Sequence, residues 1–211
     1  DNGYAIAENI GAVKYFTSNN NWKKLSKNFF NSLGFKYTLI EDGHNVTKLI
    51  KTLNSIKNSA VPHLLHVKTV KGKGLEISKN HIYKMHFSTP FNSVTGEGAS
   101  PTLRGKSYAK EMSKILYKKL KNDKNFFVIT PATPYANELQ DCIKDFPNNV
   151  IDVGMAEQHS FGFAAGLRLN KSNVVLCIQS TFMQRAFDQI YHDISFMKLP
   201  ITIVCSRSGF G

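Results

Sequence analysis

Cysteine is scarce in this 211-residue sequence, and no hydrophobic run is long enough to span a membrane. The 3 cysteines, Cys142, Cys177 and Cys205, show neither CxxC spacing nor a metal-binding pattern. Cys177 and Cys205 lie within apolar, strand-like runs, so we expect them to be ordinary core thiols. The start of the chain does not resemble a signal peptide. This cysteine usage excludes a disulfide scaffold and is typical of a reducing compartment.

Acidic residues are also few, because 15 aspartates and glutamates stand against 27 lysines and arginines, a formal net charge of +12. Such a balance can indicate binding to nucleic acid or to an anionic membrane surface. The lysines are scattered, however, and many lie beside asparagines, as in Lys27-Asn28 and Lys57-Asn58. No patch of interleaved basic and aromatic residues, which single-strand binders use, accompanies them. We therefore expect anionic small molecules, phosphates above all, as partners, with no nucleic acid and no membrane.

Both halves of the sequence alternate strand-like and helix-like runs. In the first half, the apolar spacing predicts strands at 35–40 and 62–69 and helices at 22–35 and 46–58. In the second half, it predicts strands at 125–130, 149–153, 174–178 and 201–205 and helices at 108–121, from Glu157 onward, and at 182–196.

This alternation predicts an α/β fold with parallel, helix-covered sheets. We expect two domains, residues 1–95 and 106–211, joined by a linker at 96–105 that is rich in small and turn-forming residues. The runs 64–69 and 174–178 are continuously apolar, which predicts central strands buried on both faces.

The stretch Asp152–His159 joins an expected buried strand to a helix rich in small residues. Between this strand and this helix stands one carboxylate, Glu157, whose burial would be costly without a partner. A helix-start acid that complements the helix dipole is the simpler interpretation. A second motif, Q-S-T-F-M-Q-R-A-F-D-Q at 179–189, favours a functional role for Glu157 over that simpler interpretation. Together, D-V-G-M-A-E-Q-H and S-T-F-M-Q-R-A-F-D-Q closely resemble the pyrimidine-binding domain of the 1-deoxy-D-xylulose-5-phosphate synthases, thiamine-diphosphate enzymes of the transketolase superfamily.

The resemblance implies condensation of pyruvate with glyceraldehyde 3-phosphate, with loss of CO₂. This reaction is the first step of the non-mevalonate isoprenoid pathway and also feeds thiamine and pyridoxal synthesis. The resemblance further implies thiamine diphosphate and Mg²⁺ as cofactors, a homodimer, and a plastid-type (apicoplast-like) organelle or the bacterial cytoplasm as the location. Two alternatives stay open: transketolase-type ketol transfer, and a catalytically silent subunit that keeps the fold.

The resemblance assigns roles in the second half residue by residue. Glu157 matches the catalytic carboxylate that hydrogen-bonds the aminopyrimidine ring of the cofactor. Phe182 matches the aromatic residue stacked on that ring, and Met155 matches the apolar residue on its other side. Arg185 and Arg207 match substrate-binding positions, and a guanidinium suits carboxylate and phosphate. Arg207 would contact the phosphate of the aldehyde.

In the first half, the same resemblance implies that the side chain of Asn2 and the carbonyl of Tyr4 hold Mg²⁺. Lys71, in a Lys-Gly-Lys-Gly loop after an expected strand, would contact the diphosphate. His86 would face the thiazolium ring and the substrate as a catalytic residue. By themselves, an Asp-Asn-Gly turn and a lone histidine indicate little.

Three positions depart from the family pattern. Leu75 and Gln179 stand where typical members have tyrosine, and Ser206 stands where they have aspartate. The Gly-Asp-Gly half of the cofactor motif is absent, and Asp1 begins what resembles the interior of a longer sequence. We therefore expect a fragment, or a chain with missing segments, that is inactive by itself.

Overall fold

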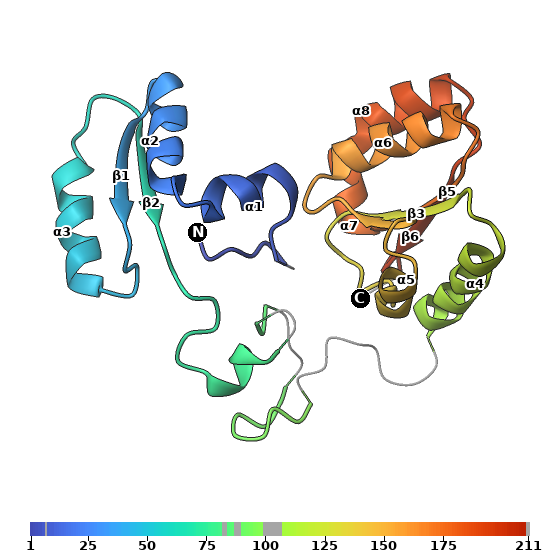
Figure 1. Ribbon diagram of the computed structural model, residues 1–211, viewed down its shortest axis with the longest axis horizontal. Coiled ribbons are helices and arrows are strands. Elements are labelled where there is room, and N and C mark those ends of the chain that lie inside the picture. Colours follow the sequence, from blue (N-terminus) through green and yellow to red (C-terminus); the bar gives the residue numbers. More distant parts are fainter. Residues whose placement is uncertain (7, 82–83, 87–89, 99–106, 210–211) are drawn as a thin grey trace. The chain divides into compact units, whose positions relative to one another are not determined.

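The computed structural model describes residues 1–6, 8–81, 84–86, 90–98 and 107–209. The chain divides into two compact units, Asp1–His86 and Phe87–Gly211 (Figure 1). The expected domain limits at 95 and 106 stay a prediction, because most of the expected linker at 96–105 lies outside the described residues. Among the described residues, no helix combines the length and the apolar character needed to cross a bilayer.

The first unit is built on two parallel strands, β1 (Lys36–Ile40) and β2 (His63–Val67). Three α-helices and a short 3₁₀ helix accompany them: α1 (Gly11–Ser18), α2 (Trp22–Ser32), α3 (Val46–Ile56) and η1 (Glu76–Lys79). Figure 1 shows the strands between α2 and α3, as a strand–helix–strand unit requires. Gly34, with φ +85°, turns the chain from α2 into β1. The side chain of Asn45 caps α3 by accepting a hydrogen bond from the Lys48 backbone N–H at 2.9 Å.

Strand β2 differs from its expected place. It is half-buried along its length, and β1 is its only strand partner in the described part of the chain. Along its other edge, the described backbone hydrogen bonds involve Asp1. The backbone nitrogen of Asp1 donates to the Val67 carbonyl at 2.6 Å, and the Thr69 backbone N–H donates to the Asp1 carbonyl at 2.9 Å. The prediction of a central strand buried on both faces is therefore wrong for β2 in the described residues.

The second unit contains a fully parallel four-stranded sheet in the order β4-β3-β5-β6. The strands are β3 (Phe126–Thr130), β4 (Val150–Asp152), β5 (Asn173–Gln179) and β6 (Thr202–Ser206). Helices α4 (Tyr108–Asn122) and α5 (Gln140–Asp145) cover one face, and α6 (Glu157–Leu169) covers the other (Figure 1). The sheet confirms the expected α/β class, and α5 is an element that the sequence pattern does not predict.

Alternate side chains of β5 enter two separate cores. Val175 and Cys177 join the cluster beneath α4 and α5, whereas Leu176 and Ile178 join the cluster beneath α6. The strand lies between β3 and β6 and is buried from its second residue to its last. The prediction of a central strand buried on both faces is confirmed for β5.

The segment after β5 departs from the single helix that is expected at 182–196. It consists of α7 (Ser180–Met183), a 3₁₀ turn η2 (Gln184–Ala186), α8 (Phe187–Gln189) and a π-helical segment η3 (Ile190–Phe196). The apolar residues that meet the α6 cluster, Met183, Ala186, Ile190 and Ile194, are three or four positions apart. Such spacing fits helices of different pitch, so the sequence pattern identifies the buried face and misses the breaks.

Leu176→Ala should destabilise the second unit strongly, because this side chain is fully buried in β5. Loss of buried methyl groups and the remaining cavity cost about 2–5 kcal/mol of unfolding free energy. Leu169→Ala, at the exposed end of α6, is the matched control and should cost less than about 0.5 kcal/mol. Urea unfolding followed by circular dichroism measures both. Equal losses would contradict the central position of β5.

Candidate functional site

The turn after β4 places Glu157 at the first position of α6. Gly154 adopts φ +71° in this turn, a conformation that glycine reaches without strain. The Glu157 side chain is only 7% exposed, and its Oε2 accepts a hydrogen bond from Nη1 of Arg185 at 3.1 Å. The buried carboxylate therefore has the charged partner that its burial requires. This contact is new relative to the sequence analysis, which assigns Arg185 to substrate alone.

A second carboxylate, Asp152, joins the loop that follows β3 to the loop that follows β4. Its Oδ1 accepts hydrogen bonds from the backbone nitrogen of Ala132 at 2.8 Å and of Gly154 at 2.9 Å. Ala132 lies in the left-handed region with φ +56°, so the loop after β3 depends on such support. Burial raises the pKa of Asp152, and the two backbone hydrogen bonds oppose that rise. This role of Asp152 is not predicted from the sequence, where its one visible signal is an acid at a strand end two residues before a glycine.

Two apolar side chains remain accessible near Glu157. Met155, in the same turn, is 54% exposed, and Phe182, in α7 three residues before Arg185, is 36% exposed. Arg207 follows β6 and is exposed, and its backbone carbonyl accepts a hydrogen bond from Ser180 Oγ at 2.8 Å. These residues lie in loops or helix starts that follow β4, β5 and β6. The sheet is parallel, so they share its carboxyl edge, where open α/β sheets bind ligands.

In the first unit, Lys71 connects three segments. Its Nζ donates to the carbonyls of Ala5 at 2.9 Å and Ile6 at 3.3 Å, lies 3.0 Å from Nδ1 of His86, and lies 5.5 Å from the centre of the Tyr4 ring. Burial lowers the pKa of Lys71. Burial and the neighbouring Lys71 charge lower the pKa of His86, which favours a neutral imidazole whose Nδ1 accepts from the ammonium.

Asn2 and Tyr4 form a closed turn beside this lysine. The Asn2 Oδ1 accepts a hydrogen bond from the Tyr4 backbone N–H at 2.9 Å, and Asn9 donates to the Gly3 carbonyl at 2.8 Å. The amide oxygen of Asn2 keeps one further lone pair, so it can also bind a cation. Within the described ranges, no group of three or more His, Cys, Asp and Glu side chains could hold a metal ion. The expected roles of Asn2 and Tyr4 as Mg²⁺ ligands therefore stay a prediction.

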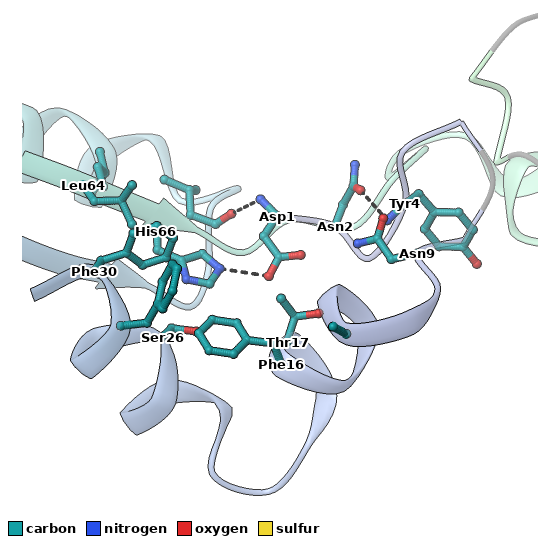
Figure 2. A pocket seen from close by; sticks show the side chains of 14 residues that line it. Asp1, Asn2, Tyr4, Asn9, Phe16, Thr17, Ser26, Phe30, Leu64 and His66 are labelled. Carbon is teal, nitrogen blue, oxygen red and sulfur yellow. Dashed lines mark hydrogen bonds and ion pairs between the residues drawn. The ribbon is translucent and has the colours of Figure 1, made fainter. Parts of the chain in front are cut away.

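Asp1 anchors that turn to β2. Its Oδ2 accepts from Nε2 of His66 and from Nζ of Lys68, both at 2.9 Å, and Nδ1 of His66 lies 2.6 Å from the Tyr37 hydroxyl. Burial, followed by nearby positive charges, lowers the pKa of His66. A neutral His66 can therefore donate to Asp1 through Nε2 and accept from Tyr37 through Nδ1. Figure 2 shows His66 directed at Asp1, one residue from Asn2.

A hollow of about 780 Å³ opens beside these residues in the first unit (Figure 2). Its polar lining comes from Asp1, Asn2, Asn9, Thr17, Ser26 and His66. Most of the remaining lining is apolar and comes from α1, α2 and β2: Phe16, Phe29, Phe30, Leu64, Leu65 and Val67.

Comparisons with known proteins match both halves of the chain. The family described as "Transketolase, pyrimidine binding domain" matches residues 104–211, and the family "1-deoxy-D-xylulose-5-phosphate synthase" matches residues 17–69. A 1-deoxy-D-xylulose-5-phosphate synthase from Listeria monocytogenes is 36% identical over 218 residues, covering 99% of this chain and 36% of the relative. The enzyme of the same name from Trichormus variabilis is 41% identical over 182 residues, covering 85% of this chain and 28% of the relative.

A third relative of that name, from Clostridium perfringens, is 37% identical over 181 residues, covering 86% of this chain and 29% of the relative. The chain thus spans about a third of the length of these relatives. Among solved structures, "Split gene transketolase, inactive beta4 tetramer" is 26% identical, with a TM-score of 0.43, covering 48% of this chain and 34% of that one. This score is too low to support a structural argument.

Parallel, helix-covered sheets define an α/β protein, a class in which ligands commonly bind at the carboxyl edge of the sheet. The comparisons make this class specific, because the pyrimidine-binding domain of transketolases spans half of the chain. The chain belongs to the transketolase family and, within it, groups with the 1-deoxy-D-xylulose-5-phosphate synthases. The resemblance carried by the two motifs is confirmed.

Asp152→Asn should leave the loop geometry intact, because one side-chain oxygen accepts both backbone hydrogen bonds. Burial raises the pKa of Asp152 in the folded state, so the folded protein binds a proton more readily than the unfolded chain. The wild type should therefore lose stability relative to the Asn variant as the pH rises above about 4.

Urea unfolding near pH 4 and near pH 7 tests this sign. Asp152→Ala is the matched variant, since it removes both hydrogen bonds and should cost about 1–3 kcal/mol of unfolding free energy at either pH. A wild type that gains stability over the Asn variant with rising pH would contradict the assignment.

Proposed function

We propose that the full-length protein is a 1-deoxy-D-xylulose-5-phosphate synthase, a transferase that condenses pyruvate with glyceraldehyde 3-phosphate with loss of CO₂. One observation carries this proposal. A buried carboxylate, Glu157, begins α6 two residues after the accessible Met155 and is hydrogen-bonded to the segment that carries Phe182, inside a domain whose family is described by pyrimidine binding. Relatives that carry this enzyme's name match both halves of the chain.

The donor set around Glu157 suits the aminopyrimidine ring of thiamine diphosphate. Oε2 of Glu157 is occupied by Arg185, and within the described residues Oε1 carries no hydrogen bond. The accessible apolar surfaces of Met155 and Phe182 are available to pack on the two faces of a flat ring. A Cβ built on Gly154 would meet no atom within 4 Å, so there is open space beside the turn. When bound, the cofactor would supply the carbanion chemistry.

The residues of the second unit then have separate tasks. Glu157 holds a proton at the pyrimidine nitrogen through Oε1, which is general acid–base work by a positioned carboxylate. Phe182 and Met155 orient the ring. Arg207 binds the phosphate of the aldehyde, for which a guanidinium is geometrically suited.

The residues of the first unit serve the charged end of the cofactor and the substrate. Lys71 contacts the diphosphate as a point charge, and the oxygens of Asn2 and Tyr4 bind Mg²⁺. His86, whose pKa is lowered by burial and by Lys71, accepts from the Lys71 ammonium through Nδ1, so its Nε2–H can donate a hydrogen bond to a reacting group. The contact between Lys71 and His86 supports placing both in one site.

Further properties follow from the same proposal. The enzyme would act as a homodimer at the entry to non-mevalonate isoprenoid synthesis and would feed thiamine and pyridoxal synthesis. The reported relatives are bacterial, which favours a bacterial type of enzyme, in the cytoplasm or in a plastid-type organelle. Gln179 and Ser206, which depart from the family pattern, are paired at the ends of β5 and β6.

Glu157→Gln in the full-length protein should slow hydrogen–deuterium exchange at the thiazolium carbon by about two to four orders of magnitude. The amide keeps the shape of the side chain and removes its charge, so thiamine diphosphate should still bind. Exchange followed by NMR without either substrate isolates this step. Glu111→Gln, which breaks an exposed ion pair in α4, is the control and should exchange at the wild-type rate. If the Glu157 variant binds the cofactor and exchanges at the wild-type rate, Glu157 only complements the dipole of α6 and does not activate the cofactor.

Arg207→Ala should raise the KM for glyceraldehyde 3-phosphate by about tenfold or more, because a hydrogen bond to a charged group is lost. The KM for pyruvate should stay nearly unchanged, since pyruvate has no phosphate. Arg168→Ala is the matched control, because this arginine donates to the Ser172 carbonyl at the far end of α6. Steady-state kinetics with each substrate varied in turn measure both KM values. Equal damage to both KM values would assign Arg207 to the fold or to the cofactor.

A further inference from the structure

The Arg185 side chain contacts Glu157, the residue proposed above to hydrogen-bond the cofactor. Its Nη1 donates to Oε2 of Glu157, which lies 28 positions earlier in the chain. We propose that Arg185 is a positioning residue, which holds and orients the Glu157 carboxylate for the cofactor and is not a substrate ligand. This inference rests on the proposed role of Glu157 in binding the pyrimidine ring.

The difference in burial between the two side chains indicates that Arg185 compensates the charge of Glu157. Glu157 is 7% exposed, whereas Arg185 is 56% exposed. The carboxylate is thus the group that needs compensation, while the guanidinium keeps most of its hydration. Removing one partner of a buried charge is costly because the other charge stays behind without a partner. Arg185 therefore satisfies a requirement that Glu157 creates.

The backbone around Arg185 holds its guanidinium in place. Arg185 lies in η2, and the next residue, Ala186, is fully buried in the core beneath α6. Met183, two residues earlier, packs against the same core. The arginine therefore reaches Glu157 from an anchored turn, which suits a positioning residue better than a mobile substrate ligand.

The hydrogen bond also selects which carboxylate oxygen faces the ligand. Because Arg185 occupies Oε2, the rotation of the Glu157 carboxylate is fixed, and Oε1 remains for the ring nitrogen. The same contact joins the start of α6 to the segment that carries Phe182 three residues before Arg185. One ion pair thus sets the relation between the carboxylate and the aromatic residue that would contact the same ring.

A double-mutant cycle in the full-length protein tests this assignment. The variants are Arg185→Gln, Glu157→Gln and the combination of both. Isothermal titration calorimetry without substrate measures the dissociation constant of thiamine diphosphate, and NMR measures exchange at its thiazolium carbon. Arg185→Gln should weaken cofactor affinity and slow exchange by about tenfold each when Glu157 is present. In the Glu157→Gln background it should change either quantity by less than about twofold.

Two further variants complete the design. Arg185→Lys keeps the charge and should recover most of the affinity and exchange, with correct folding checked by circular dichroism. It also keeps the test decisive if the Gln variant does not fold. Lys114→Gln removes a cation from an exposed ion pair with Glu111 and should leave both quantities at the wild-type value. The KM values for pyruvate and glyceraldehyde 3-phosphate in Arg185→Lys should stay within about twofold of wild type.

Three results would overturn the inference. Raised KM values with unchanged cofactor affinity and exchange would make Arg185 a substrate ligand. Equal effects in both Glu157 backgrounds would make it a residue that supports the fold. A wild-type protein that binds no thiamine diphosphate would refute the proposed function itself, and the calorimetry of the wild type alone distinguishes that failure from the other two.

Discussion

The second unit depends on the burial of one negative charge. Glu157 is placed where the strand β4 has just ended and α6 begins, and its carboxylate is almost fully removed from water. Such a group is stable there only with a charged hydrogen-bond donor, and Arg185 provides it at 3.1 Å from a separate segment. The surrounding small residues of α6, including Ala164 and Ala165, allow the helix to pack closely on the sheet that carries the turn.

The parallel sheet explains why functional side chains distant in sequence can share one edge. In a parallel sheet all strands end on the same side, so the segments after β4, β5 and β6 emerge there together. Asp152 strengthens this edge by bonding to backbone nitrogens on both the β3 and β4 loops. A half-buried acid thus joins the two loops at the edge where α6 begins with the buried Glu157.

In the first unit, the side chains of Lys71 and Asp1 join separate segments of the chain. Lys71 follows β2 and gathers the carbonyls of Ala5 and Ile6 together with the ring of His86. Asp1 performs the converse task, since its carboxylate collects His66 and Lys68 from β2 and so holds the Asn2 turn. Two groups of charged side chains thus hold the start of the chain against the segment that follows β2.

The sequence alone determined the α/β class, the elements with clear periodicity and the family, because hydrophobic spacing and two short motifs are local properties. It also predicted that Glu157 begins the helix after β4, as the structure shows. Only the tertiary structure decided the half-buried position of β2, since burial depends on which strands are its neighbours. It alone decided the breaks at 184–190, because apolar spacing does not distinguish helical pitch. The tertiary structure was also needed to find the hydrogen bond from Arg185 to Glu157 and the hydrogen bond from the Ala132 backbone to Asp152. Each joins separate segments, so it depends on how the chain folds back on itself.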